Sequence, residues 1–257
     1  MPVSANWFQV WFNSPYYHQL FEYQKHHAGG QPFLSALLKK VGSPSTAHIA
    51  DLCCRQGNDA ILLAGMGYDV NGIDLGGENI EAAKPLETDR LHFFQHDLRL
   101  PFWINYFDLA INLYNGFGFY RTEHEHYNAI RTVAQSIRED GFLVLDYDNT
   151  RYKENNLIPK LQLQIGNVDY LITKWFDETH FFRKIYIEDE NLSEPLEFTE
   201  RLTKFSLGDF TDMFAFHHLQ IQQVFGDYNF SPYDIEKSPR LIMIAQKKPT
   251  PGHKPAI

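Results

Sequence analysis

The chain has 257 residues and a formal net charge of -9, and its length suits one α/β domain with an embellishment better than two complete domains. Lysine and arginine are scattered, so no basic stripe is present to neutralise phosphates, and we expect no nucleic-acid partner. The apolar runs are too short to span a bilayer and the N-terminus lacks a basic region followed by an apolar core, so we expect no membrane partner and a cytoplasmic location.

The N-terminal segment, residues 7–21, is unusually aromatic. Within it, Ser14-Pro15 predicts the start of a helix, because proline is favoured in the first helical turn. The residues alone indicate a hydrophobic arm docked on the core, since aromatic clusters usually supply packing area. A second helix over about 31–41 precedes a turn that begins at Gly42 and leads to the first strand.

Residues 47–84 predict a strand, a loop, a helix and a second strand. The first strand ends at Asp51-Leu52, and the helix covers about 58–66. The second strand, 68–74, closes with Asp74. A carboxylate at the carboxyl edge of a parallel sheet can accept both hydrogen bonds from a ribose diol, so this segment predicts a nucleotide site.

This segment resembles the first motifs of the class I S-adenosylmethionine-dependent methyltransferases, which have the form D-L-G-C-G-x-G, then a helix, then G-x-D. The loop here reads Asp51-Leu52-Cys53-Cys54-Arg55-Gln56-Gly57, so Cys53 and Arg55 replace the first two glycines and Gly57 remains. The resemblance implies that this loop and Asp74 bind S-adenosylmethionine. Arg55 has two expected outcomes: its side chain folds away and pairs with a carboxylate, or it fills the place of the methionine end.

The resemblance also implies roles for the N-terminal helix and for the acid after the third strand. Family members often open with an S-P-Y-Y-x-x-L helix that covers the methionine end of the cofactor, and Tyr17 belongs to the matching segment. The third predicted strand, 91–95, leads to Asp97 and Leu98. In the family the acid at this position accepts a hydrogen bond from the adenine amino group, which implies that Asp97 lies beside adenine.

A fourth strand over 106–113 precedes the sequence Tyr114-Asn115-Gly116-Phe117-Gly118-Phe119, which looks like the family motif beneath the transferable methyl group. Glycines at this place permit close approach of the backbone to a ligand. Asn112 and Asn115 have side chains of the type that holds a substrate or the amino group of the cofactor. Asp108 lies too early on the strand to reach a ligand.

The next segments predict a fifth strand and an inserted lid. A helix over about 123–138 ends at Asp140-Gly141, and residues 142–147 form the fifth strand. Alternating apolar and polar residues within 162–204 predict three antiparallel strands. Inserted after the fifth strand, such a sheet would rise over the carboxyl edge of the main sheet and form one wall of a substrate cavity.

The C-terminal elements complete the expected architecture. A helix over 207–217 is followed by strands over 219–225 and 240–246, and the resemblance implies a parallel sixth strand and an antiparallel seventh. We therefore expect an α/β, Rossmann-like, seven-stranded methyltransferase fold, mostly parallel, in a single domain over residues 1–248. Its predicted parts are an N-terminal helical cap at 1–42, a core at 43–150 and 205–248, an antiparallel β lid at 160–204 and a disordered tail at 249–257.

The implied function is transfer of a methyl group from S-adenosylmethionine to a small-molecule acceptor, leaving S-adenosylhomocysteine. In-line displacement at a sulfonium needs little covalent help, so alignment and exclusion of water are the main contributions expected from the protein. The candidate catalytic residues are Tyr17, His18, Asn115 and Tyr228. The aromatic residues expected near the cavity predict a partly apolar or aromatic acceptor: Tyr17, Phe117, Trp175 and Tyr228. The expected cofactor contacts are Tyr17, Asp51, Cys53, Cys54, Arg55, Gly57, Asp74, Leu75, Asp97, Leu98, Asn112 and Leu113.

The alternative function is a non-catalytic protein that keeps the fold as a binding or structural module, with its cofactor pocket altered by Arg55. A nicotinamide dehydrogenase is disfavoured because a G-x-G-x-x-G loop is absent from the sequence. No metal site is expected, since His124 and His126 are two apart on a helix and point to different sides. The adjacent Cys53 and Cys54 are expected to be reduced loop residues.

Overall fold

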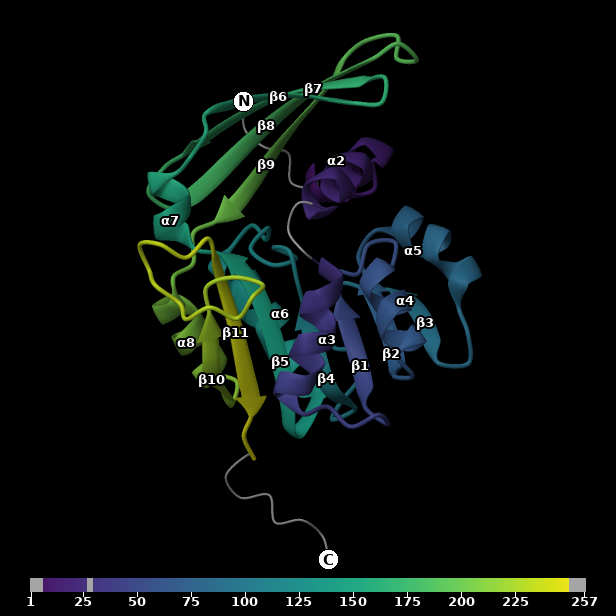
Figure 1. The fold of residues 1–257 in the computed structure, drawn as a ribbon, viewed down its shortest axis with the longest axis vertical. Coiled ribbons are helices and arrows are strands. Elements are labelled where there is room, and N and C mark those ends of the chain that lie inside the picture. Colours follow the sequence, from purple (N-terminus) through teal and green to yellow (C-terminus); the bar gives the residue numbers. More distant parts are fainter. Residues whose placement is uncertain (1–6, 27–29, 250–257) are drawn as a thin grey trace, which may run out of the picture.

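The computed structural model describes residues 7–26 and 30–249, and the predicted tail lies almost entirely outside the described residues. Figure 1 shows two β-sheets, with a four-stranded antiparallel sheet above the upper edge of a seven-stranded sheet. The helix α2, Pro15–His26, lies between the two sheets in this view. This arrangement is the predicted α/β methyltransferase fold with an inserted antiparallel sheet.

The seven-stranded sheet has the order β10-β11-β5-β4-β1-β2-β3. The strands β1 to β5 are parallel to one another, whereas β11 is antiparallel to both of its neighbours, β5 and β10. The predicted sixth and seventh strands are therefore confirmed, with the seventh inserted beside the fifth. The strands are β1 (His48–Leu52), β2 (Asp69–Asp74), β3 (Leu91–Gln95), β4 (Phe107–Asn112), β5 (Ile137–Asp148), β10 (Leu219–Phe225) and β11 (Arg240–Lys247).

Helices cover both faces of this sheet, which explains why its central strands are nearly continuous apolar runs. Alternate residues of β1 point to opposite faces, so Ile49 packs with one group of helices and Ala50 with the other. The first group is α3 (Gly30–Val41), α4 (Asn58–Gly65) and α5 (Gly77–Ala83), followed by a short 3-10 helix, Lys84–Leu86. The second group is α6 (Glu123–Ser136) and α8 (Leu207–Ala215). None of the helices in the described part of the chain is long and apolar enough to cross a membrane.

The inserted sheet has four strands, so the prediction of three was wrong. It has the order β6-β7-β8-β9, with the additional strand β6 pairing with β7 across a turn at Gly166-Asn167. Gly166 has a φ of 60°, which glycine adopts readily. The missed strand lies at the edge of the sheet and is half exposed, so its pattern is weak. The strands are β6 (Lys160–Ile165), β7 (Val168–Phe176), β8 (His180–Asp189) and β9 (Leu196–Thr203).

The boundary between α6 and β5 also differs from the prediction. The helix ends at Ser136, and β5 begins at Ile137 rather than after Gly141. Ile137 pairs with Phe107 on β4, and the register then shifts before pairing resumes at Phe142. Gly141 lies inside the strand at this irregularity, where an added Cβ would stand 2.9 Å from the backbone oxygen of Asp108. The Asp-Gly pair therefore marks a distortion of the strand and not the end of the helix.

The N-terminal aromatic segment packs against the inserted sheet. It forms α1 (Trp7–Phe12) and α2, whose predicted start at Pro15 is confirmed. The side chains of Trp11 and Leu20 pack with the inward residues Tyr170 and Ile172 of β7. Trp11 Nε1 also donates a 2.5 Å hydrogen bond to Glu200 on β9. The unpredicted helix α7, Thr150–Asn155, precedes this sheet in the chain.

Candidate functional site

Two cavities open at the carboxyl edge of the main sheet, on the side that faces the inserted sheet. We call the first the loop cavity, because the loops after β1, β2, β3 and β4 line it together with α1 and α2. The second, the sheet cavity, lies between α2, the loops after β4 and β5, and the strands β7, β8 and β9. Phe12, Tyr17, Asn115 and Phe119 line both cavities, so the two spaces share one wall.

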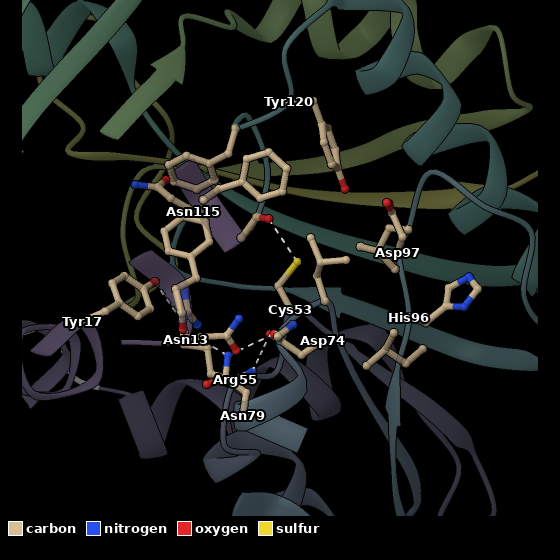
Figure 2. Close-up of a pocket in the computed structure, with 18 residues that line it drawn as sticks. Asn13, Tyr17, Cys53, Arg55, Asp74, Asn79, His96, Asp97, Asn115 and Tyr120 are labelled. Carbon is tan, nitrogen blue, oxygen red and sulfur yellow. Dashed lines mark hydrogen bonds between the residues drawn. The ribbon is translucent and has the colours of Figure 1, made fainter. Parts of the chain in front are cut away.

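The loop cavity has the predicted carboxylates on one side and the N-terminal helices on the other. Figure 2 shows Cys53 near its centre, with His96 and Asp97 on one side and Asn13 and Tyr17 on the other. Of the predicted cofactor contacts, seven line this cavity: Tyr17, Cys53, Arg55, Asp74, Leu75, Asp97 and Leu98. The carboxyl ends of β2 and β3 therefore place Asp74 and Asp97 in the same space.

Asp74 organises the loop around it by accepting hydrogen bonds on both carboxylate oxygens. One oxygen accepts from the backbone N–H of Gly76 at 2.7 Å and from the side-chain amide of Asn79 at 3.1 Å. The other accepts from the backbone N–H of Arg55 at 2.9 Å. A carboxylate has about four acceptor positions, so one remains for a ligand hydroxyl.

The glycine replacements keep the backbone conformation that glycine would favour. Cys53 and Arg55 have φ values of 59° and 56°, and the remaining glycine of the loop, Gly57, has a φ of 80°. A left-handed backbone is strained for residues with a side chain, and such strain usually occurs at functional sites. Gly57 itself lies outside both cavities, and an added Cβ there would stand 2.2 Å from the Phe93 ring.

The Arg55 side chain takes an intermediate position between its two expected outcomes. Its guanidinium lies 3.7 Å from the centre of the Phe21 ring, and Nε donates to the Tyr17 hydroxyl at 3.2 Å. A second nitrogen donates to the backbone oxygen of Tyr114 at 3.4 Å. No carboxylate of the described residues forms an ion pair with this guanidinium, although Arg55 still lines the loop cavity. The stretches outside the described residues contain no Asp or Glu.

Cys53 is a half-buried thiol that lines the loop cavity. Burial raises its pKa to about 12, so the thiol stays protonated near neutral pH. Its Sγ donates to the backbone oxygen of Gly116 at 3.1 Å, which links the loop after β1 to the loop after β4. A protonated thiol in this bond is a poor nucleophile, so Cys53 has a positioning role.

Asp97 is already paired with a neighbouring cation. Arg99 donates to it from the backbone N–H at 2.9 Å and from Nε at 3.0 Å, and a second guanidinium nitrogen lies 2.6 Å away. Burial opposes ionisation of Asp97, but the bonds from Arg99 outweigh it and hold its pKa below the usual value. Leu98 is buried beside it and gives the cavity an apolar surface.

The remaining predicted cofactor contacts lie around the loop cavity rather than in it. Asp51, Cys54 and Leu113 line a small recess on the far side of Arg55, together with the catalytic candidate His18. Asn112 lies beneath the loops, where its amide donates to the backbone oxygen of Leu52 at 3.3 Å. Asp108 is buried at the start of β4 and accepts from the backbone N–H of His48 at 2.8 Å, away from either cavity.

The catalytic candidates Tyr17, Asn115 and Tyr228 all line the sheet cavity. The Tyr228 hydroxyl donates to Asp146 at 2.8 Å, and burial followed by the charge of Asp146 raises its pKa. This phenol is therefore a hydrogen-bond donor and not a ready proton acceptor. Burial likewise raises the pKa of Tyr17, so its hydroxyl is neutral near pH 7.

The aromatic residues expected near the acceptor divide into two groups. Tyr17 and Tyr228 line the sheet cavity, whereas Phe117 is buried in the core and Trp175 is 41% exposed on the opposite face of the lid. The prediction that Phe117 and Trp175 face the cavity is wrong. Trp175 instead stacks on its cross-strand neighbour Phe182, because the register of β7 turns it outward.

Several side chains in the sheet cavity were not anticipated from the sequence, and most are charged. They include Lys153, Lys174, Arg183, Glu200 and Arg240. Alternation along β7 and β8 carried a signal for Lys174 and Arg183, but only the register assigns those residues to the inner face. Among the described residues, no group of three or more His, Cys, Asp or Glu side chains could hold a metal ion.

Comparison with known proteins agrees with this geometry. A family model described as a methyltransferase domain matches residues 50–145, which include the loops that carry Arg55, Asp74 and Asp97. YqeM of Bacillus subtilis, whose name describes an expected methyltransferase, is 22% identical over 80% of this chain and 87% of its own length. Residues 50–145 of this chain thus resemble a methyltransferase domain, and its fold is that of a solved S-adenosylmethionine-dependent methyltransferase.

Solved methyltransferases share the fold at low sequence identity. An S-adenosylmethionine-dependent methyltransferase from Clostridium acetobutylicum is 13% identical, with a TM-score of 0.72 over 85% of this chain and 90% of its own. The sugar N-methyltransferase KedS8 from Streptoalloteichus is 14% identical, with a TM-score of 0.70 over 90% and 93%. The 1,6-didemethyltoxoflavin-N1-methyltransferase of Burkholderia thailandensis, solved with S-adenosylhomocysteine, has a TM-score of 0.58 at 14% identity over 97% and 92%. This chain thus has the fold of methyltransferases whose names give different acceptors.

Proposed function

We propose that this protein transfers a methyl group from S-adenosylmethionine to a small-molecule acceptor. The observation that carries the proposal is the wall shared by the loop cavity and the sheet cavity. A displacement between two bound molecules requires the donor and the acceptor in adjacent spaces with one opening between them. Tyr17 and Asn115 lie at this wall, at the boundary where a methyl group would pass.

The loop cavity contains groups that match each part of S-adenosylmethionine. Asp74 keeps one acceptor position for a ribose hydroxyl, and Asp97 lies beside the apolar surface of Leu98 on the side proposed for adenine. Arg55 is a half-buried cation without an ion-pair carboxylate partner among the described residues, and the methionine end of the cofactor carries a carboxylate. We therefore assign Arg55 as the methionine anchor and not as an obstruction.

The bound cofactor would supply an electrophilic methyl group on a sulfonium. The lone pair of an acceptor would form the new bond to carbon, and sulfur would keep the electron pair of the broken carbon–sulfur bond. The contribution of this chain is to align the acceptor and to exclude water, for which the aromatic wall of Phe12, Tyr17 and Phe119 is suited. Tyr17 and Asn115 remain the candidate groups for orienting an acceptor at the shared wall.

A non-catalytic protein of the same fold is the second candidate. The observation that favours it is that both carboxylates of the loop cavity already accept hydrogen bonds from the protein. Asp74 accepts three such bonds, and Asp97 is bound by Arg99. A site of this kind would have little left to offer the ribose and adenine. Under this alternative, neither the cofactor nor its product would bind.

Titration calorimetry with S-adenosylhomocysteine and S-adenosylmethionine distinguishes the two candidates. We expect micromolar binding to the wild-type protein and a loss of about 100-fold or more for Asp74→Ala, since a buried charge-assisted contact and three loop bonds disappear together. Asp69→Ala, at the other end of β2, is the matched control and should bind like wild type. Thermal melting of both variants tests that the fold is retained. Absence of binding in a folded wild-type protein would reject the methyltransferase activity.

A further inference from the structure

The sheet cavity has more positive charge on its walls than negative charge. Four cations line it, Lys153, Lys174, Arg183 and Arg240, against two carboxylates. Most of these charges are paired: Arg183 binds Glu200 at 2.5 Å, and Lys153 forms an ion pair with Asp148. Arg240 binds both Asp148 and, at 2.7 Å, the buried Asp146 behind it. Four cations thus face three carboxylates, and Lys174 is the cation left over.

Lys174 is on the inner face of the lid sheet by strand register. It follows Tyr170 and Ile172 at two-residue intervals on β7, and both of those side chains are buried against the N-terminal helices. Its direct cross-strand neighbour on β8 is Arg183. Among the described residues, no carboxylate forms an ion pair with Lys174, and the stretches outside them contain no Asp or Glu.

A purely structural role does not account for this arrangement. Like charges directly opposite one another destabilise a sheet, and a half-buried ammonium costs free energy that an apolar residue would not. The cavity nevertheless has a volume of about 390 Å³, which is in the range for metabolite-sized ligands. Its other walls are aromatic, from Phe12, Phe119 and Phe181. A cation that destabilises the empty cavity is stabilised when a ligand brings the missing negative charge.

We infer that the sheet cavity binds a small anionic acceptor, with a carboxylate or phosphate group held by Lys174 and an apolar or aromatic body against the ring side chains. This inference gives the substrate class for the proposed methyl transfer and so rests on that function. The anionic group lies at the lid end of the cavity, because Lys174 belongs to β7. The nucleophilic atom of the acceptor then faces the shared wall at Tyr17 and Asn115.

The test measures binding of simple probes, with no cofactor present. Benzoate and phenyl phosphate carry the two candidate anions on one aromatic ring, and benzamide is the neutral match for benzoate. In NMR titrations we expect at least one anion to bind the wild-type protein about tenfold or more tightly than benzamide. Lys174→Met should weaken anion binding by about tenfold or more, while Lys174→Arg should retain most of it.

The matched control is Lys184→Met. Lys184 lies on β8 of the same sheet, where it forms an exposed ion pair with Glu197 at 2.9 Å. This variant should bind the probes like wild type. Lys174→Met should also melt higher than wild type, by roughly 2–4 °C, because it removes an uncompensated cation. A lower melting temperature would show that Lys174 stabilises the fold and would count against the inference.

The two proposals fail in different ways. If neither anion binds the wild-type protein, or both bind Lys174→Met equally well, the anionic acceptor is rejected whatever S-adenosylhomocysteine does. If the anions bind through Lys174 but S-adenosylhomocysteine does not bind at all, the cavity is an anion site and the methyltransferase activity is rejected. The relative affinities of benzoate and phenyl phosphate then indicate which anionic group the site prefers.

Discussion

The loop cavity and the sheet cavity share a wall but differ in how their charges are compensated. In the loop cavity the carboxylates are fixed by neighbouring donors: Asp74 by three hydrogen bonds and Asp97 by Arg99. In the sheet cavity the cations outnumber the carboxylates, and Lys174 has a cation as its cross-strand neighbour. The first site is organised before a ligand arrives, whereas the second gains charge balance only when a ligand binds.

The two cavities also differ in what determines their lining residues. Local sequence determines the lining of the loop cavity, and tertiary packing determines that of the sheet cavity. The loop cavity is made from residues that directly follow strands of a common fold, so related enzymes can keep it while their acceptors differ. The sheet cavity draws four of its six charged lining residues from the inserted sheet and α7, and the other two, Asp148 and Arg240, from β5 and β11. Acceptor specificity is expected to reside in those inserted elements.

Removing Glu200 should produce the largest effect, because it deprives the partly buried Arg183 of its carboxylate partner. Glu200 accepts two bonds from Arg183 and one from Trp11 Nε1. We expect Glu200→Ala to lower the free energy of unfolding by about 3–5 kcal/mol in denaturant titrations. Glu197→Ala on the same strand breaks only an exposed pair and should cost less than about 0.5 kcal/mol. If both variants lost the same free energy of unfolding, the ion pair in the sheet cavity would contribute no more to stability than an exposed pair does.

The Arg55 substitutions test whether the loop cavity also contains a cation that binds a ligand, namely the carboxylate of the cofactor. Arg55→Gln should weaken S-adenosylhomocysteine binding by about tenfold, or about 1.4 kcal/mol, through loss of a charge-assisted contact. Arg55→Gly should weaken it as well, although glycine relieves the backbone strain at a φ of 56°. Calorimetry on both variants decides the matter, since tighter binding to Arg55→Gly would mean that the wild-type side chain blocks the pocket.

The smallest expected effect is a pH dependence of stability caused by titration of the Lys174 amine. Burial, followed by the charges of Arg183 and Lys153, lowers the pKa of this amine from 10.5, while Asp148 and Glu200 oppose the shift. The unfolded chain therefore keeps this proton to higher pH than the folded protein does, so raising the pH from the folded pKa toward 10.5 stabilises the fold.

The measurement compares wild type with Lys174→Met by denaturant titration between pH 7 and 10. The stability deficit of the wild-type protein should shrink as the pH rises, because its amine loses the uncompensated charge. Affinity for benzoate should fall over the same range. Parallel stability curves for the two proteins would show that Lys174 is not perturbed in the folded state.

Sequence predicted the main sheet and the carboxylates of the loop cavity because both depend on short-range patterns. Asp74 and Asp97 follow apolar strands directly, and parallel strands bring their carboxyl ends to one edge. The position of the Arg55 side chain could not be predicted, since Arg55 lies in the loop after β1 and its side chain contacts Phe21 of the distant helix α2. Lys174 was missed because a one-residue slip in β7 would turn it outward, and register is not a local property.

The errors in the inserted sheet have a similar cause. The strand β6 was missed because an edge strand exposes half of its residues and needs little apolar sequence. Trp175 was assigned to the cavity by residue type, whereas pairing with β8 places it outside. In the inserted sheet, alternation identified β7, β8 and β9, but only the pairing assigned their residues to the inner or the outer face.

The hydrogen bond from Trp11 to Glu200 joins residues 189 positions apart, and this separation determines when the site can be completed. During synthesis the N-terminal helices emerge first, at about 5–20 residues per second, and their partner strand follows only after most of the chain. A contact that closes so long a loop forms slowly. Both cavities use Phe12 and Tyr17 from this early segment as walls. The newly made chain therefore cannot complete the walls of its ligand sites until β9 has been synthesised, although the N-terminal helices emerge first.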